Sequence, residues 1–268
     1  MNDDSRIAAQ AEHEDPSCHS CIPLYLWFAS PKNVCMGADS TRMLSNDETS
    51  RYEAFHFERD RREYLASCLL VRNALSHYHP VPPRAWTFRR NRYGKPSPDP
   101  DCGLRFNLSN SPGLVVCLLG RGVDVGVDAE PFDRASHAAS VCGEFLSDLE
   151  KAQLEGLSDE EKLDRTLSLW TLKESYIKAR GIGLTLPLQR FSFVFDEADG
   201  IRLSIDPCLN DDSTNWRFCL LSLDEHRVAL CVRTRQHPEL EIWEIHHPLV
   251  ASPKRRLEPK ITWCPRIL

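Results

Sequence analysis

Two stretches decide the fold, VDVGVDAEP (residues 123–131) and LWTLKESYIKARGIGL (residues 169–184). In the first, valines alternate with acidic or small residues, which is typical of a strand that points successive side chains to opposite faces. Asp128 and Glu130 therefore share one face. Pro131 lacks a main-chain donor and places this pair at the end of the strand, where open sheets often hold ligands.

The second stretch has helical spacing, with apolar residues three and four positions apart. Glu174 and Lys178 are four residues apart and lie on one face of this helix. Gly181 suits a left-handed C-terminal position, which predicts that the helix ends near Arg180. Taken alone, each motif also fits a solvated ion pair or a turn, but together the acids and the lysine could form one metal-phosphate site.

The remaining pattern mixes strands and helices. Strands are predicted at 24–30, 85–90, 114–120, 123–130, 191–195, 216–223 and 227–234, and helices at 59–78, 146–155 and 165–180. This mixture predicts an α+β fold. Residues 1–21 are predicted to be a disordered extension, and residues 248–268 a proline-rich basic tail.

Composition excludes several function classes. The 268 residues carry a net charge of -6, which argues against a nucleic acid or an anionic membrane as partner. A hydrophobic content of 41% suffices for a substantial core. No apolar run approaches the roughly twenty residues that span a bilayer, and no signal peptide precedes the scattered cysteines, so we expect a reduced, cytoplasmic protein. The CxxC at 18–21 has no second pair at zinc spacing and is not assigned a metal.

Four motifs together carry a family resemblance. YGKP (93–96), FNLSNSPG (106–113), VGVDAE (125–130) and LWTLKESYIKARGIGLTLPL (169–188) occur in the order and approximate spacing of the 4'-phosphopantetheinyl transferases. The chain resembles the long, surfactin-synthetase-activating type of this superfamily from about residue 24 to residue 236. The helix motif and VDAE are the most specific parts.

The resemblance implies two similar α/β subdomains related by a pseudo-twofold axis, here residues 22–122 and 123–247, with the active site in the cleft between them. It implies transfer of 4'-phosphopantetheine from coenzyme A to a serine of an apo acyl or peptidyl carrier protein. The reaction would need Mg²⁺ and release adenosine 3',5'-bisphosphate. Because both halves lie in one chain, a monomer would suffice.

The resemblance also implies roles at the metal end. Asp128, Glu130 and Glu174 would bind Mg²⁺, since hard carboxylate oxygens suit this ion. Glu174 would also take the proton of the attacking serine, directly or through a metal-bound water. Lys178 would offset charge on the leaving phosphate.

At the nucleotide end, Lys95 of the GKP match and Arg51 correspond to phosphate contacts, and Ser109 would share in binding coenzyme A. Lys173 would face the nucleotide or the pyrophosphate. Asn110 stands where many members carry a histidine that holds the 3'-phosphate, and its neutral amide predicts a weaker contact.

Two other functions are compatible with the same residues. A different Mg²⁺-dependent phosphotransferase or nuclease could use the same three acids, and it would act on nucleotides or nucleic acid. A non-catalytic protein that binds coenzyme A or a carrier could share the fold, although binding alone has no evident need for Glu174 and Lys178.

Overall fold

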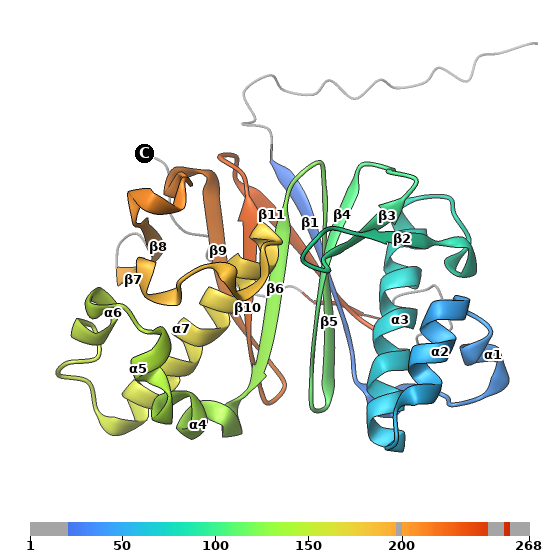
Figure 1. The fold of residues 1–268 in the computed structure, drawn as a ribbon, viewed down its shortest axis with the longest axis horizontal. Helices are drawn as coiled ribbons and strands as arrows, with labels where there is room; N and C mark the ends of the chain where they lie inside the picture. The colour runs from blue at the N-terminus through green and yellow to red at the C-terminus, as the bar shows by residue number, and fades with distance from the viewer. Residues whose placement is uncertain (1–20, 197–199, 246–254, 258–268) are drawn as a thin grey trace, which may run out of the picture.

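The computed structural model describes residues 21–196, 200–245 and 255–257. Its centre is formed by two sheets packed face to face, and each sheet is covered on its outer side by one long helix. Figure 1 shows the resulting layers, with α3 (Glu58–Tyr78) and α7 (Asp159–Arg180) on opposite sides of the strands. No helix in the described ranges has the length and apolarity needed to cross a membrane.

The first half begins with β1 (Ile22–Ala29), followed by the short helices α1 (Ala38–Thr41) and α2 (Asn46–Ala54) and then by α3. Two hairpins follow, β2 (Thr87–Arg90) with β3 (Pro96–Asp99) and β4 (Leu104–Ser111) with β5 (Leu114–Arg121). Within the sheet, β5 lies between β1 and β4, and both pairings are antiparallel.

The second half repeats this plan. It consists of β6 (Val125–Pro131), α7, the hairpin β7 (Phe191–Asp196) with β8 (Gly200–Ile205), and the hairpin β9 (Trp216–Leu223) with β10 (His226–Arg233). Its sheet has the order β6-β10-β9, which matches β1-β5-β4. Three short helices, α4 (Ala135–Ser140), α5 (Cys142–Phe145) and α6 (Asp148–Ala152), join β6 to α7. The equivalent strand orders confirm an α+β fold of two similar halves.

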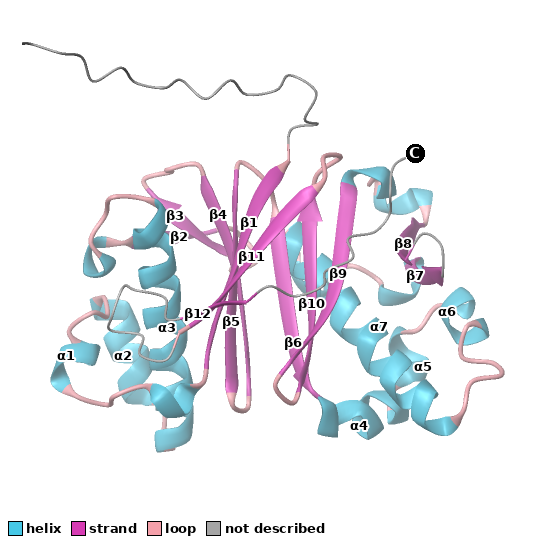
Figure 2. Cartoon of the chain, turned by 180° about the vertical axis from the view of Figure 1, so that it is seen from behind, coloured by secondary structure: helices cyan, strands magenta, loops and turns pink. Residues whose placement is uncertain are grey.

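The end of the chain returns to the first sheet. β11 (Pro238–Glu244) pairs with β1 in parallel, and β12 (Arg255–Leu257) pairs with β11 (Figure 2). This differs from the predicted division, which gave residues 123–247 to the second half. The physical reason is that β11 covers the edge of β1, whose main-chain groups would otherwise lack partners.

Alternation along the strands builds a core shared by both halves. Leu24, Leu26 and Phe28 of β1 pack between the two sheets, whereas Trp27 and Ala29 pack against the helix side. Strands from both sheets contribute to the central cluster. Because neither sheet buries this face alone, each half completes the core of the other.

The predicted strands are all found, with boundaries shifted by at most two residues. The helix predicted at 165–180 begins earlier, at Asp159, because Ser158 and Glu161 form a capping box. The helix predicted at 146–155 is confined to α6. The predicted terminal extensions at 1–21 and 248–268 lie outside the described residues, apart from Cys21 and the strand β12.

Candidate active site

The site is built where α7 lies directly on β6. Gly126 allows this contact, because a Cβ there would lie only 2.0 Å from the carbonyl oxygen of Ser175 on the helix. The left-handed Gly181 ends α7, as the sequence predicted. This packing brings Glu174 and Lys178 to the same cavity as Asp128 and Glu130.

Asp128 is the most buried of the predicted metal ligands, with 4% of its surface exposed. Its Oδ1 accepts hydrogen bonds from Lys178 Nζ at 2.6 Å and from Ser109 Oγ at 3.0 Å. Lys178 Nζ also donates to Ser109 Oγ at 3.0 Å. Asp128 Oδ2 is buried with no hydrogen-bond partner, so one carboxylate oxygen is left available for a ligand.

Glu130 is held by two donors from different elements. Trp170 Nε1 on α7 donates to its Oε1 at 3.0 Å, and Arg134 donates to its Oε2 at 3.3 Å. Burial and the nearby Asp128 raise the pKa of Glu130, whereas the bond from Trp170 lowers it. The two donors fix the orientation of this carboxylate.

Glu174 is the carboxyl most perturbed by its surroundings. Burial, followed by the charges of Asp128 and Glu130, raises its pKa to about 7, although Lys178 acts in the opposite direction. A carboxyl that titrates near neutral pH can exchange protons with a substrate, and such perturbed groups often mark functional sites.

Side chains of β4 join the two halves at this point. Asn107 Oδ1 accepts a hydrogen bond from the main-chain N–H of Val127 at 2.8 Å, and Ser109 Oγ accepts one from that of Ala129 at 3.3 Å. These residues alternate along β4, so their side chains point to the same face of the strand. They connect β6 to the first sheet where no main-chain ladder joins β4 and β6.

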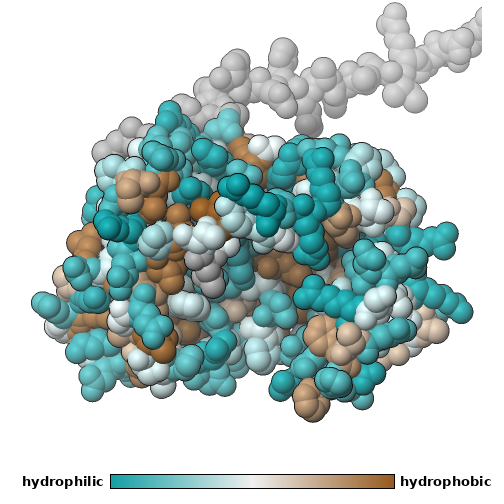
Figure 3. Space-filling model, in the orientation of Figure 1, coloured by the Kyte–Doolittle hydropathy of each residue, from teal (hydrophilic) through white to brown (hydrophobic). Residues whose placement is uncertain are grey.

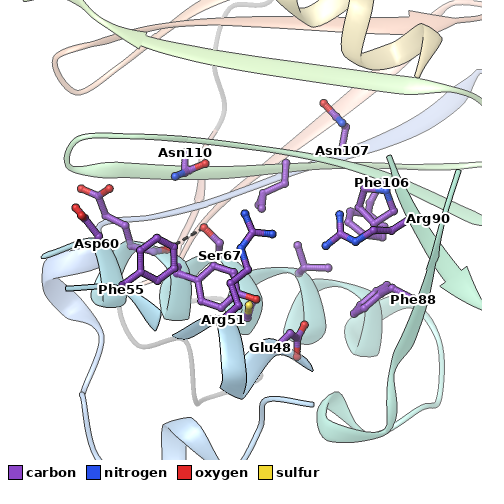
Figure 4. A pocket seen from close by; sticks show the side chains of 16 residues that line it. Glu48, Arg51, Phe55, Asp60, Ser67, Phe88, Arg90, Phe106, Asn107 and Asn110 are labelled. Carbon is purple, nitrogen blue, oxygen red and sulfur yellow. Dashed lines mark hydrogen bonds between the residues drawn. The ribbon is translucent and has the colours of Figure 1, made fainter. Parts of the chain in front are cut away.

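The acids line a cavity of about 360 Å³ that also includes Ser109, Asn110, Arg134, Trp170 and Lys178. A second cavity of about 430 Å³ lies between α2, α3 and the strands of the first half, and Asn110 lines both. Figure 4 shows Arg51 reaching from α2 toward the strand that carries Asn110, with Arg90 entering from β2. The shared residue connects the acidic cavity to a cavity whose lining has two arginines beside the carboxylates of Glu48, Asp60 and Glu63.

Two predicted binding residues lie elsewhere. Lys95 does not line either cavity; its Nζ donates to the carbonyl oxygens of Val125 and Ala179 at 3.1 and 2.8 Å. Burial lowers its pKa to about 8. Lys173 is fully buried, pairs with Glu150 at 2.9 Å, and donates to the carbonyls of Leu188 and Phe191. Both ammonium groups are therefore occupied by protein groups in this structure, away from the two cavities that the other predicted site residues line.

The fit of the acids to a metal ion depends on their spacing and on their free oxygen atoms. Within the described residues, no three acidic, histidine or cysteine side chains are already spaced as metal ligands. The unpartnered Asp128 Oδ2 and the raised pKa values of Glu130 and Glu174 nevertheless favour a cation, whose charge would relieve their repulsion. An all-carboxylate donor set suits Mg²⁺. The residues present fit a divalent cation held by Asp128, Glu130 and Glu174.

Sequence reasoning assigned no role to two residues that shape the site. Trp170 lies four residues before Glu174, and this helical spacing is the signal in the sequence that could have indicated its contact with Glu130. Asn107 was part of FNLSNSPG, and its alternation with Ser109 indicated a shared strand face. Their partners lie on distant segments, so the pattern alone did not reveal the contacts.

Comparison with known proteins gives consistent matches. The family model described as 4'-phosphopantetheinyl transferase superfamily matches residues 124–231, and the model described as 4'-phosphopantetheinyl transferase, N-terminal, matches residues 27–120. The chain is 30% identical to the 4'-phosphopantetheinyl transferase HetI of Nostoc sp., with 76% of this chain and 92% of HetI covered. It is 32% identical to the 4'-phosphopantetheinyl transferase Sfp of Bacillus subtilis, with 73% and 85% covered.

A mouse relative, L-aminoadipate-semialdehyde dehydrogenase-phosphopantetheinyl transferase, is 27% identical, with 72% of this chain and 68% of the relative covered. The two family models meet at the junction between β5 and β6, so each corresponds to one of the repeated halves. From the matched family models and relatives, this chain belongs to the 4'-phosphopantetheinyl transferase superfamily and is an enzyme of the long, Sfp-like type.

Proposed function

We propose that this enzyme transfers 4'-phosphopantetheine from coenzyme A to a serine hydroxyl of an apo acyl or peptidyl carrier protein, with Mg²⁺, and releases adenosine 3',5'-bisphosphate. The observation that carries the proposal is the pair of cavities that meet at Asn110. One offers arginines for phosphate groups, and the other offers three carboxylates and a lysine for the reacting pyrophosphate.

The nucleotide end binds by charge and ring contacts. Arg51 and Arg90 line the larger cavity together with the aromatic side chains of Phe55, Tyr64 and Phe88. Guanidinium groups pair well with phosphate, and aromatic rings offer flat surfaces to an adenine. Asn110 can donate a neutral hydrogen bond to the 3'-phosphate from its position between the cavities.

At the acidic end, Glu174 accepts the proton of the carrier serine as its oxygen attacks the phosphorus on the pantetheine side. The new bond joins the serine oxygen to that phosphorus, and the bond to the adenosine-side phosphate breaks. Lys178, with 29% of its side chain exposed, offsets the charge on the leaving phosphate. Bound Mg²⁺, held by Asp128, Glu130 and Glu174, would supply charge neutralisation for the pyrophosphate.

The carrier protein must reach this end of the site. Arg134 lines the acidic cavity, and half of its side chain is exposed, so it offers a positive group at the rim to an acidic carrier. The face seen in Figure 3 is mostly hydrophilic, with hydrophobic residues in small groups among them. Both cavities are formed by one chain, which supports a monomeric enzyme.

The proposal is tested by following both products at once. With coenzyme A, Mg²⁺ and an apo carrier, one adenosine 3',5'-bisphosphate should form for each carrier modified, as measured by chromatography. Chelation of the metal should stop both signals, and Mg²⁺ should restore them. Release of a different nucleotide, or full activity in the presence of the chelator, would contradict the proposal.

A further inference from the structure

The tip of the β2–β3 hairpin, residues 91–95, contacts the second half of the molecule at the junction of β6 and α7. We propose that Lys95 and Asn91 are positioning residues, which hold the catalytic helix α7 in register with the acidic strand β6. This inference rests on the roles proposed above for Asp128 and Glu174.

Lys95 binds both elements at once. Its Nζ donates to the carbonyl of Val125, the first residue of β6, at 3.1 Å, and to the carbonyl of Ala179 in the last turn of α7 at 2.8 Å. Val125 lies three residues before Asp128, and Ala179 directly follows Lys178. One ammonium group thus fixes the spacing between the strand and the helix that form the acidic cavity.

Asn91 adds a second contact between the hairpin and the end of α7. Its Nδ2 donates to the carbonyl of Gly181 at 2.7 Å, and its Oδ1 accepts from the main-chain N–H groups of Tyr93 and Lys95. A Cβ on Gly181 would lie 2.8 Å from Lys95 Cδ, so the left-handed glycine leaves room for the lysine stem. The side chains of the hairpin fit the helix end closely.

The chemistry of a helix end explains why a cation lies there. The last carbonyls of a helix have no partner within it and carry partial negative charge, which favours a lysine. Lys95 and Asn91 satisfy the carbonyls of Ala179 and Gly181. Removing Lys95 would leave buried carbonyl groups unpaired, and the last turn of α7, which carries Lys178, would lose its fixed position.

The same hairpin also reaches the nucleotide cavity, which Phe88, Arg90 and Pro96 line. Lys95 itself does not line that cavity. The hairpin therefore connects the nucleotide end to the acidic end, and Lys95 contributes through α7 rather than through a phosphate contact.

The test compares Lys95→Met with Arg51→Met, since both replace a cation with an unbranched apolar chain. Calorimetry gives the dissociation constant for adenosine 3',5'-bisphosphate, and transfer at saturating coenzyme A, well below either melting temperature, gives kcat. We expect Lys95→Met to keep the dissociation constant within about twofold while lowering kcat at least about tenfold. Arg51→Met should raise the dissociation constant by about tenfold.

A second variant, Asn91→Asp, keeps the acceptor oxygen for Tyr93 and Lys95 but removes the donor to Gly181. It should also lower kcat without raising the dissociation constant for adenosine 3',5'-bisphosphate. The inference is overturned if Lys95→Met raises the dissociation constant for adenosine 3',5'-bisphosphate as much as Arg51→Met does. It is equally overturned if Asn91→Asp transfers at the wild-type rate. A failure of the proposed function itself would differ, because the wild-type protein would then transfer nothing.

Discussion

Glu174 is the residue whose chemistry depends most on its neighbours. Burial and the charges of Asp128 and Glu130 raise its pKa to about 7 in the metal-free protein. The environment that raises this pKa makes the ionised form of Glu174 costly without a cation. Its titration is therefore linked to the stability of the fold.

This linkage predicts a pH-dependent effect of Glu174→Gln. Below pH 4.5, the carboxyl is protonated in both the folded and the unfolded chain. Between pH 4.5 and about 7, only the unfolded chain ionises, so the free energy of unfolding falls as pH rises, and the loss is complete above about pH 7. In the presence of a chelator at about pH 8, Glu174→Gln should therefore have a higher melting temperature than the wild type. The increase should be about 2–4 °C for each kcal/mol gained in the free energy of unfolding.

Thermal denaturation followed by circular dichroism provides the measurement. The melting difference should shrink as pH falls toward 4.5. An equal difference at about pH 5 and about pH 8 would show that ionisation of Glu174 is not its cause.

Trp170 acts on Glu130 through one hydrogen bond, and this can be tested separately from packing. Trp170→Phe removes the N–H donor but keeps a ring against Phe145, whose centroid lies 5.0 Å from that of Trp170. Because groups that orient metal ligands affect metal affinity about 10- to 100-fold, we expect Mg²⁺ binding to weaken at least about tenfold.

Calorimetric titration with Mg²⁺ measures this affinity. Trp216→Phe is the matched control, since it removes an indole donor that serves Asp211 rather than Glu130. Unchanged Mg²⁺ affinity in Trp170→Phe, or an equal loss in both variants, would remove the role assigned to Trp170.

At this scale, the sequence indicated that the acidic group and Lys178 lie together, but it did not indicate the partners of Lys95 and Lys173. Asp128, Glu130, Glu174 and Lys178 follow from periods of two and four residues, and all four line one cavity. The ends of Lys95 and Lys173 could not be placed in the same way. A lysine has a long flexible side chain, and its partners here are carbonyls set by tertiary packing.

The helix α7 carries Glu174 and Lys178, and a buried ion pair anchors its middle. Lys173 and Glu150 both have fully buried side chains, and the Glu150 carboxylate also accepts the main-chain N–H groups of Ser147 and Phe193. Burial lowers the pKa of Lys173, while Glu150 acts in the opposite direction. The pair ties the helix to α6 and β7, directly beside Glu174.

Lys173→Met should therefore destabilise the protein without weakening coenzyme A binding. Breaking a buried pair leaves one charge uncompensated, and we expect the free energy of unfolding to fall by about 3–5 kcal/mol. Urea unfolding measures this change. Exposed Lys151→Met, which removes a surface pair with Asp148, is the control and should cost less than about 1 kcal/mol.

An equal, small effect of both substitutions on stability would contradict the anchoring role of Lys173. A large rise in the dissociation constant for coenzyme A in a stably folded Lys173→Met protein would instead support the phosphate contact that the sequence predicted.

Elements with a clear apolar period were predictable, and β4 shows why others were not. Its segment, LRFNLSNS, interrupts the apolar alternation with Asn107 and Ser109. These polar side chains replace a main-chain ladder to β6. A search for alternating hydrophobic residues therefore does not detect β4 as a strand. β11 was missed for a related reason, because its charged and polar positions lie outside the shared core.

The whole molecule consists of two structurally similar halves that show no repeat in the sequence. Both halves run strand, helix, hairpin, hairpin, with equivalent strand orders. No sequence repeat indicated this, since packing requires apolar residues at core positions but tolerates many identities there. The two sheets share one core, the acidic cavity lies where the halves meet, and the adjoining cavity is lined by the first half alone. The three carboxylates of the acidic cavity come from one half, and the residues of the proposed nucleotide cavity come from the other.

The most direct test of this account is the intact mass of an apo carrier protein after incubation with the enzyme, coenzyme A and Mg²⁺. The wild-type enzyme should add the mass of one phosphopantetheine arm. Glu174→Gln should add none in the same time, while still binding adenosine 3',5'-bisphosphate. The account would be contradicted if the wild-type enzyme left carriers from several pathways unmodified. It would also be contradicted if Glu174→Gln transferred at the wild-type rate.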